Sequence, residues 1–298
     1  ARRRAARSAR TSRSLRPVPQ ELPSFDLVVA TVGRVDELDR LLDSLEAQEY
    51  RGVRVIVVDQ NEDARVERIV DGRTFEVLHL RSHPGLSHAR NAALAHVAAD
   101  VVAFPDDDCA YPGGLLARLA DRFAGDPGLD GLTGRSQDAV GASAASWKTD
   151  PAVLADDNLW NRAISFTIFL RRAVVERVGA FDERLGLGSS EPWSSGEEID
   201  YLIRAVRTGA RIEYDPALVV EHGVGANDAR VGLRDGASVG YLLRKHRYPV
   251  RTVMRMLVRP AGGVVVSFVR RDRARTSFHV ATLRGRIVGY RGFRGKSA

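Results

Sequence analysis

Three consecutive aspartates, Asp106–Asp108, directly follow a short apolar segment in the stretch VVAFPDDDCAYP (residues 101–112). Neighbouring carboxylates repel one another and are costly to desolvate unless a cation or a hydrogen-bond donor compensates their charge. Hard divalent cations such as Mg²⁺ and Mn²⁺ prefer oxygen ligands, often carboxylates together with phosphate oxygens. The triplet is therefore a candidate metal site, although a solvated turn is the commoner setting for such a run.

A second acidic pair, Glu197 and Glu198, stands where the Gly/Ser-rich segment GAFDERLGLGSSEPWSSGEEID (179–200) runs into a helical pattern. The first turn of a helix favours negative charge, which is a purely structural reason for the pair. A carboxylate in this position can also act as a general base that removes a proton from an attacking hydroxyl. His222 follows the apolar residues LVV and is either a core histidine or a ligand.

The elements that must position these residues alternate between strand and helix. Strands are expected at FDLVVATV (25–32), VRVIVVD (53–59), FEVLHL (75–80) and DVVAFPDDD (100–108), and helices at DELDRLLDSLEAQ (36–48), EDARVERIV (62–70) and LSHARNAALAHVA (86–98). This order predicts an α/β fold with a mostly parallel central sheet flanked by helices. Ligands of such sheets bind at the carboxyl ends of the strands, where Asp59 and Asp106–Asp108 fall.

The second half of the chain is less regular. DGLTG (130–134), ISFTIFLRR (164–172), RIEYD (211–215) and LVVEHG (218–223) are expected to be strands, and EEIDYLIRAVRTG (197–209) a helix.

Seven segments, in order, resemble the family-2 glycosyltransferases, which are inverting enzymes of the GT-A fold that use nucleotide-sugar donors. The matching segments are ATVGR (30–34), VVD (57–59), GLSHARN (85–91), PDDD (105–108), VGAFDE (178–183), GEEIDYLIR (196–204) and VEH (220–222). The resemblance covers roughly residues 25–223.

The resemblance implies a role for each matched position. Donor binding is expected of Thr31, Arg34, Asp59, Arg90, Asp106 and Asp107, and metal binding, of Mn²⁺ or Mg²⁺, of Asp106, Asp108 and His222. Glu198 takes the place of the family's catalytic base, which is usually Asp. Glu197, Asp200 and Trp193 are expected to bind the acceptor, although a buried structural Trp is an equal alternative for Trp193. The partners implied are a nucleoside-diphosphate sugar donor and a glycan or lipid-linked acceptor.

Two other classes of enzyme or module compete with this interpretation. A nucleotidyltransferase also sets carboxylates on an α/β sheet, but ATVGRVDE is a poor version of its Gly-rich basic loop. A non-catalytic glycosyltransferase-like module is disfavoured because the acidic site positions are retained.

Charge is unevenly distributed along the chain. Residues 1–16 contain seven Arg and no acid, residues 244–298 contain 15 Lys and Arg against Asp272 alone, and residues 17–243 carry a net charge of −14. An acidic body would repel phosphates, so no nucleic-acid partner is expected. The composition predicts a disordered basic tail (1–22), a catalytic domain (23–243, with a nucleotide-binding half at 23–125 and an acceptor half at 126–243) and a basic amphipathic region (244–298).

The basic C-terminal region suggests an anionic membrane surface as a further partner. In VRTVMRMLVR (250–259), apolar residues and Arg recur at helical spacing, so the helix lies in a membrane interface or closes the catalytic domain. No continuous run approaches the ~18–20 apolar residues of a membrane span. The single cysteine, Cys109, fits a reducing compartment. We therefore expect a cytoplasmic protein, peripheral at the inner face of the cell membrane.

Overall fold

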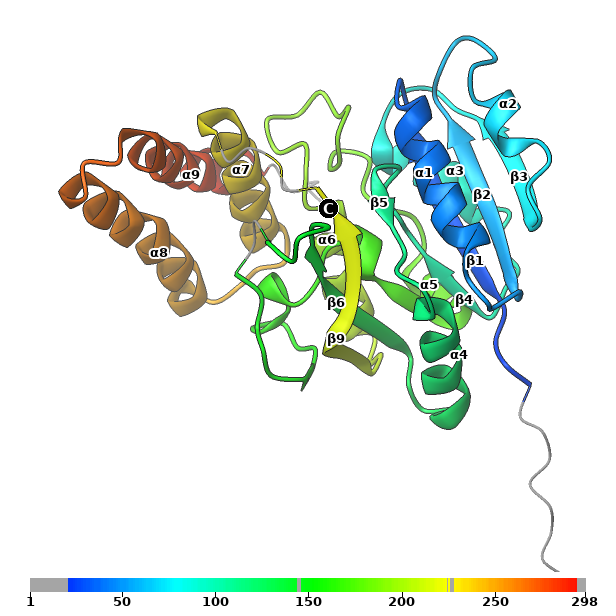
Figure 1. Cartoon of the computed structure of the whole chain (residues 1–298). Coiled ribbons are helices and arrows are strands. Elements are labelled where there is room, and N and C mark those ends of the chain that lie inside the picture. Colours follow the sequence, from blue (N-terminus) through cyan, green and yellow to red (C-terminus); the bar gives the residue numbers. More distant parts are fainter. Residues whose placement is uncertain (1–20, 144–145, 224, 226–227, 294–298) are drawn as a thin grey trace, which may run out of the picture.

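The computed structural model describes residues 21–143, 146–223, 225 and 228–293. A central sheet flanked by helices forms one part of the molecule, and the C-terminal helices α7, α8 and α9 form the other (Figure 1). The predicted α/β architecture is confirmed. The predicted disordered tail (1–22) lies almost wholly outside the described residues.

The N-terminal half of the sheet is parallel. Strands β1 (Phe25–Thr31), β2 (Val53–Asp59), β3 (Glu76–Arg81) and β4 (Val101–Ala103) lie in the order β3-β2-β1-β4. Their near-continuous apolar runs fit strands that are covered on both faces. Helix α1 (Val35–Glu46) begins just after Gly33 and buries Leu38, Leu41, Leu42 and Leu45.

The second half of the sheet is mixed. It continues through β8 (Phe169–Arg171), β6 (Gly131–Gln137), β9 (Ile212–His222) and β5 (Cys109–Ala110), with β7 (Ala152–Val153) paired to β9. Strands β6 and β9 are parallel, whereas β8, β5 and β7 run antiparallel to their neighbours. Parallel pairing therefore dominates only the N-terminal half of the sheet.

Two hydrophobic clusters cover the two faces of the sheet. One contains residues of α1 and α4 (Leu115–Gly125), and the other contains residues of α3 (Leu86–Leu94), α5 (Arg172–Val178) and α6 (Glu197–Arg207). The short helix α2 (Glu67–Val70) and the 3₁₀ turns Leu159–Asn161 and Ser165–Thr167 complete this part.

Several expected strand bounds were wrong. The strand expected at 100–108 ends at Ala103, before the aspartates. The strand expected at 164–172 is a 3₁₀ turn followed by the three-residue β8. The two strands expected at 211–215 and 218–223 are one strand, β9, although Pro216 lies inside it. Its pairing with β6 shifts register between Thr133 and Arg135, and Arg135 Nε donates to the carbonyl of Pro216. The strand accommodates the proline because proline fits at bulges, where a ladder hydrogen bond is already missing.

Helices α7 (Ala229–Lys245) and α9 (Arg273–Gly292) pack backbone to backbone. Glycines on both helices make this approach possible: Gly232, Gly236 and Gly240 on α7, and Gly285 and Gly289 on α9. A Cβ at Gly289 would lie 1.8 Å from the carbonyl oxygen of Ala237, and one at Gly240 would lie 2.0 Å from that of Arg286. The expected domain boundary at 243/244 falls inside α7, two residues before its end.

Helix α8 (Val250–Val269) packs on α9 but leaves much of its apolar surface exposed. An 18-residue window in it has a mean hydropathy of 1.4 and is 22% buried, so α8 could cross a membrane by length and composition alone. The expected absence of a continuous apolar run of that length concerns a different property, since Arg255 and Arg259 interrupt the apolar residues of α8. The average hydropathy of the window is high enough despite these two arginines.

We predict that Gly289→Ala destabilises the protein, because the new methyl group requires α7 and α9 to separate. Overpacking of this kind costs about 1–3 kcal/mol, or more where backbone is displaced, and roughly 2–4 °C of Tm follows per kcal/mol. Thermal unfolding measures the effect.

The matched control is Gly262→Ala on α8, where a Cβ meets nothing within 4 Å. That change should raise the stability by about 0.5–1 kcal/mol, the helix preference of Ala over Gly. Equal Tm shifts for the two variants would contradict the role assigned to the α7–α9 contact.

Candidate active site

The aspartate triplet lies where the sequence analysis expected it, at the carboxyl ends of β1 and β4. Strand β4 ends at Ala103, and Asp106 forms an isolated parallel bridge with Ala30 of β1. Asp107 accepts a hydrogen bond from Thr31 Oγ1 at 2.8 Å, and the guanidinium group of Arg34 contacts both Asp107 (3.0 Å) and Asp108 (2.6 Å). Thr31 and Arg34 are thus brought together with the triplet.

Asp106, Asp108 and His222 form the one group of possible metal ligands found among the described residues. One ligand atom from each lies within 4.8 Å of the others. Strand β5 pairs with the end of β9, which sets His222 opposite Cys109, and the imidazole ring stacks on Phe166 at 4.6 Å. Two carboxylates and an imidazole suit a divalent cation such as Mn²⁺, so the residues present fit the expected metal.

The carboxyl groups of the triplet differ in acidity. Burial raises the pKa of Asp106 to about 6 and also raises the pKa of Asp107. Burial acts on Asp108 as well, but the hydrogen bond from His222 and the charges of His222 and Arg34 together bring its pKa below the usual value. The contact with Asp108 raises the pKa of His222. Asp108 is thus the member of the triplet that ionises most readily.

Arg90 is buried beneath the site and connects its two halves. Its guanidinium group donates to Glu197 Oε1 at 2.8 Å and to Asp106 Oδ1 at 3.1 Å, and it lies over the rings of Phe104 and Phe181. Only 1% of the residue is exposed, so Arg90 contacts these carboxylates rather than an open surface. The family resemblance placed Arg90 in the site, but only the tertiary structure shows that Arg90 pairs with Glu197.

Glu198 is the second residue of α6. The residue before the helix, Gly196, has a φ of 78°. Burial raises the pKa of Glu198 to about 8, and the charge of the adjacent Glu197 adds to the rise. A carboxylate with such a pKa holds a proton more tightly than usual, which suits a group that accepts protons near neutral pH.

Three other expected site residues are buried away from the cleft that Glu198 lines. Asp59 is fully buried and contacts His79 and Asn61. Asp200 is fully buried among His246, Lys245 and Arg204. Trp193 is 8% exposed and stacks on Tyr241 of α7, so the structural alternative for Trp193 describes its position.

Sequence reasoning missed several residues of the site. Ser165 Oγ donates to both oxygens of Asp106, at 3.0 and 3.1 Å, and Phe166 supports His222. Both belong to the 3₁₀ turn that we had expected to be strand, so no periodic signal pointed to them.

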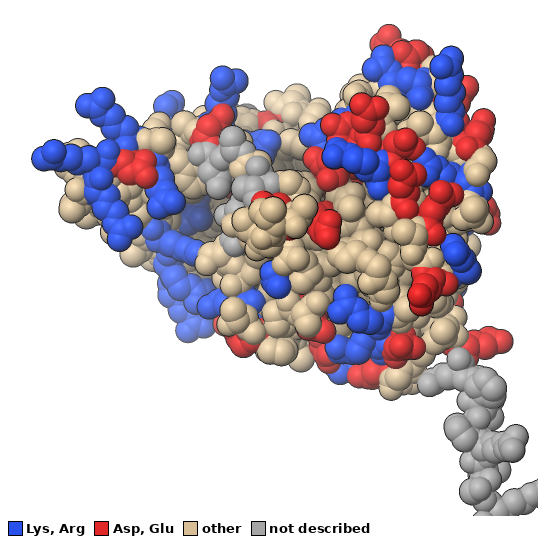
Figure 2. Space-filling model, viewed as in Figure 1, with Lys and Arg blue, Asp and Glu red and all other residues tan. Residues whose placement is uncertain are grey.

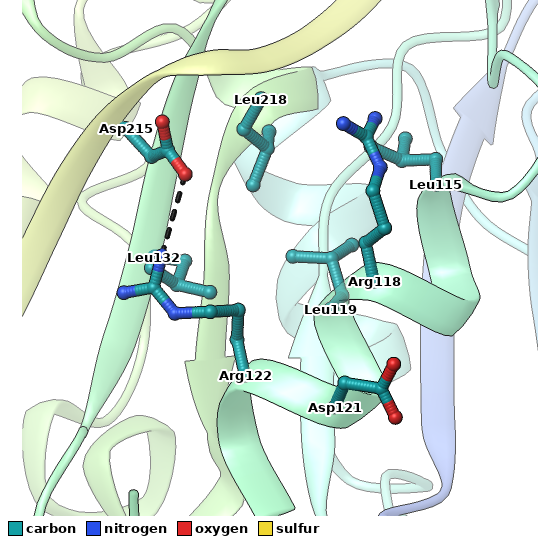
Figure 3. A pocket seen from close by; sticks show the side chains of 8 residues that line it. All are labelled: Leu115, Arg118, Leu119, Asp121, Arg122, Leu132, Asp215 and Leu218. Atoms are coloured by element: carbon teal, nitrogen blue, oxygen red, sulfur yellow. Dashed lines mark hydrogen bonds and ion pairs between the residues drawn. The ribbon is translucent and has the colours of Figure 1, made fainter. Parts of the chain in front are cut away.

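A cleft of about 330 Å³ opens beside the carboxylates. Asp106, Glu197 and Glu198 are among its lining residues, together with residues of α7. A separate hollow of about 310 Å³ lies between α4 and the strands β6 and β9, with Leu115, Leu119, Leu132 and Leu218 as its apolar residues and Arg122 paired to Asp215 (Figure 3). None of the expected site residues lines that hollow.

The family model described as Glycosyl transferase family 2 matches residues 26–177, just over half of the chain. Two curated proteins named "Pre-mycofactocin glycosyltransferase", from Mycobacterium tuberculosis strains CDC 1551 / Oshkosh and ATCC 25618 / H37Rv, are each 30% identical to it over 237 residues. The match covers 74% of this chain and 46% of each relative, so the chain spans just under half the length of these relatives.

Two solved structures share the fold. A mannosyltransferase, PcManGT from Pyrobaculum calidifontis in complex with GDP-Man and Mn²⁺, superposes with a TM-score of 0.65 at 16% identity, over 93% of this chain and 89% of that one. TarS from S. aureus has a TM-score of 0.59 at 16% identity, over 85% of this chain and 54% of that one. Both show the likeness in fold alone.

We predict that Arg90→Met destabilises the protein by about 3–5 kcal/mol, because it leaves Asp106 and Glu197 buried without their shared counter-charge. Chemical denaturation measures the loss. The double variant Arg90→Met/Glu197→Gln should recover part of it, since one of the two carboxylates is then neutral. A single variant as stable as the unmodified protein would refute the role given to Arg90.

Proposed function

Because this chain belongs to glycosyl transferase family 2, we propose that it transfers a sugar from a nucleoside-diphosphate sugar to an acceptor hydroxyl with inversion at the anomeric carbon. The observation that carries the proposal is the convergence of the Asp106–Asp108–His222 group with Glu198 on one site. The proposed acceptor is a glycan or a lipid-linked molecule. The proposal extends to the activity of the whole protein to which these residues belong.

The donor would bind at the carboxyl ends of β1, β2 and β4. Thr31, Arg34 and Asp107 form one hydrogen-bonded group there, and Arg34 is about half exposed, so its guanidinium group is accessible to a diphosphate. Asp59 supports this edge from β2. Asp106, Asp108 and His222 would hold Mn²⁺ or Mg²⁺. Bound there, such a cation would stabilise the negative charge of the departing nucleoside diphosphate.

Glu198 is the proposed general base. Its carboxylate takes the proton of the acceptor hydroxyl while the hydroxyl oxygen bonds to the anomeric carbon, and the bond from that carbon to the diphosphate oxygen breaks with its electron pair. Attack opposite the leaving group inverts the configuration. Glu197 is held by Arg90 and raises the proton affinity of Glu198 through its charge. Arg90 therefore acts as a positioning residue.

The proposal is tested with a panel of nucleotide-sugars, including GDP-mannose and UDP-glucose, by release of nucleoside diphosphate with Mn²⁺ and with a chelator. We expect release from one donor class, lost on chelation. Glu198→Gln should lower transfer by roughly 10²–10⁴-fold, the usual contribution of a general base. Transfer by the unmodified enzyme should rise with pH through the pKa of Glu198, since only the ionised carboxyl accepts a proton.

The control for this variant is Glu183→Gln, which makes the same change at an exposed glutamate of the segment VGAFDE (178–183). It should retain transfer. If Glu198→Gln transfers at the unmodified rate, Glu198 is not the base.

We further propose that the protein works at the inner face of a membrane through α8. Val250, Met254, Val258, Val265 and Val269 are each more than half exposed along this helix. Lys and Arg predominate over the end of the molecule formed by α7, α8 and α9, whereas over the sheet part Asp and Glu are interspersed with Lys and Arg (Figure 2). Apolar and basic surface together suit an anionic leaflet, where each basic residue contributes about 1 kcal/mol. A cytoplasmic location accompanies this proposal.

We predict that the protein floats with anionic liposomes at low salt and that Val265→Asp/Phe268→Asp abolishes flotation. Val140→Asp is the control, since Val140 is 88% exposed and lies outside α8. Point variants are preferred to truncation at 243, because α7 needs α9 for its packing. If the double variant floats as well as the control, α8 is not the membrane contact.

A further inference from the structure

Helix α7 forms part of the cleft beside the catalytic carboxylates, although it lies outside both the family match and the sequence resemblance. Arg234, Asp235, Ser238, Val239 and Leu242 line the cleft, at positions that share one face of the helix. The same cleft reaches Asp106, Glu197 and Glu198. Helix α7, which none of the matching segments covers, therefore borders the cleft in which sugar transfer would occur.

The groups proposed to bind the nucleotide do not line this cleft. Thr31, Arg34, Asp59, Asp108 and His222 are absent from its lining, and Asp106 is the one member of the proposed donor and metal groups that reaches it. A donor held by those groups would therefore reach this cleft beside Asp106, next to Glu197 and Glu198. The remaining volume, bordered by α7, is therefore free for the second substrate.

The α7 wall is held firmly against the loop that leads into α6. Ser195 Oγ lies 2.9 Å from Asp235 Oδ1 and 2.8 Å from Ser238 Oγ. A Cβ at Gly196 would lie 3.4 Å from both Ser238 and Leu242. These contacts fix the distance between the α7 face and Glu198, two residues beyond Gly196. Any molecule on the α7 face is therefore presented to Glu198 at a defined distance.

The α7 face of the cleft carries a pair of opposite charges, Arg234 and Asp235. Arg234 Nε donates to Asp235 Oδ1 at 2.8 Å, so the two charges compensate each other. The terminal nitrogens of Arg234 and Oδ2 of Asp235 make no hydrogen bond or ion pair with other described residues, and both side chains are partly exposed. They offer donors and an acceptor to hydroxyl groups.

Apolar side chains complete the cleft. Val239, Ile199, Leu187 and Trp160 line it together with the polar pair. A sugar ring has apolar C–H faces and hydroxyl edges, and small-molecule sites commonly combine apolar walls with a few placed polar groups. An anionic acceptor would meet Asp235, Glu197 and Glu198, so a neutral one is favoured.

We propose that the α7 face, Arg234, Asp235 and Val239 above all, is the acceptor subsite and that it binds a neutral sugar residue. The proposal rests on the glycosyltransferase function proposed above and names the acceptor class for the same site. Arg234 and Asp235 hydrogen-bond the ring hydroxyls, while Val239 contacts its apolar face. The subsite sets which acceptor hydroxyl reaches Glu198.

The test uses 4-nitrophenyl β-D-glucoside and α-D-mannoside as acceptor probes, with the donor that the enzyme hydrolyses. Both transfer to the glycoside and hydrolysis of the donor are measured. Arg234→Met removes a charge-assisted hydrogen bond to the glycoside, and Val239→Phe fills part of the space that its ring would occupy. For each variant we expect the KM for the glycoside to rise about 10-fold or more. The ratio of transfer to donor hydrolysis should fall by the same factor.

Leu233→Phe is the matched control, on the same helix but outside the cleft lining, with Leu233 39% exposed. It should behave as the unmodified enzyme. 4-Nitrophenyl β-D-glucuronide, which has the glucoside's size and an added carboxylate, should be the poorer acceptor. A better glucuronide, or no transfer to either neutral glycoside, would overturn the acceptor class. Variants at 234 and 239 that match Leu233→Phe would overturn the subsite.

These outcomes are separable from failure of the proposed function. If the unmodified enzyme neither hydrolyses nor transfers from any nucleotide-sugar, the glycosyltransferase proposal itself fails. If it does so and only the α7 variants behave unexpectedly, the function stands and the acceptor subsite lies elsewhere.

Discussion

The guanidinium group of Arg90 lies between two carboxylates that arrive from opposite halves of the chain, Asp106 after β4 and Glu197 at the start of α6. All three groups are removed from water to a large extent, and an unpaired charge in such a place costs several kcal/mol. The pairing therefore constrains the distance between the aspartate triplet and α6. Because Glu198 follows Glu197 directly, the same ion pair sets where the proposed base stands relative to the proposed metal ligands. The pKa of Glu198 is raised mainly by burial and further by the charge of Glu197, whereas the charge of Arg90 lowers it.

A second constraint comes from the C-terminal helices. Glycines let α7 and α9 approach at backbone distance, and Trp193 stacks on Tyr241 while Ser195 contacts Asp235 and Ser238. The loop before α6 is thus held by α7 as well as by the contact of Arg90 with Glu197. Buried Asp200 extends the attachment, since Lys245 and His246 contact it from the end of α7 and the residue that follows. The C-terminal helices therefore belong to the structure that positions α6 and the proposed base that it carries.

Charged side chains are arranged differently at the candidate site and at the α8–α9 end of the molecule. The site needs carboxylates close together, which is tolerable because Arg34, Arg90 and His222 compensate them locally. The α8 and α9 end carries its Arg residues on exposed helix faces next to exposed valines. Net charge alone hides this division, since the chain as a whole is only +7.

The sequence by itself determined the family and the α/β class, because buried strands, amphipathic helices and the seven matching segments leave local patterns that can be read residue by residue. The resemblance to the family also assigned Thr31, Arg34 and His222 to one site with the triplet, and the structure places all three in contact with it. The sequence did not reveal the 3₁₀ turn that brings Ser165 and Phe166 to the site, the single bulged strand β9, or the pairing of Arg90 with Glu197. Nor did it show that Trp193 and Asp200 are buried and that α7 borders the cleft. These depend on contacts between residues tens of positions apart, which only the packed chain brings within hydrogen-bond distance.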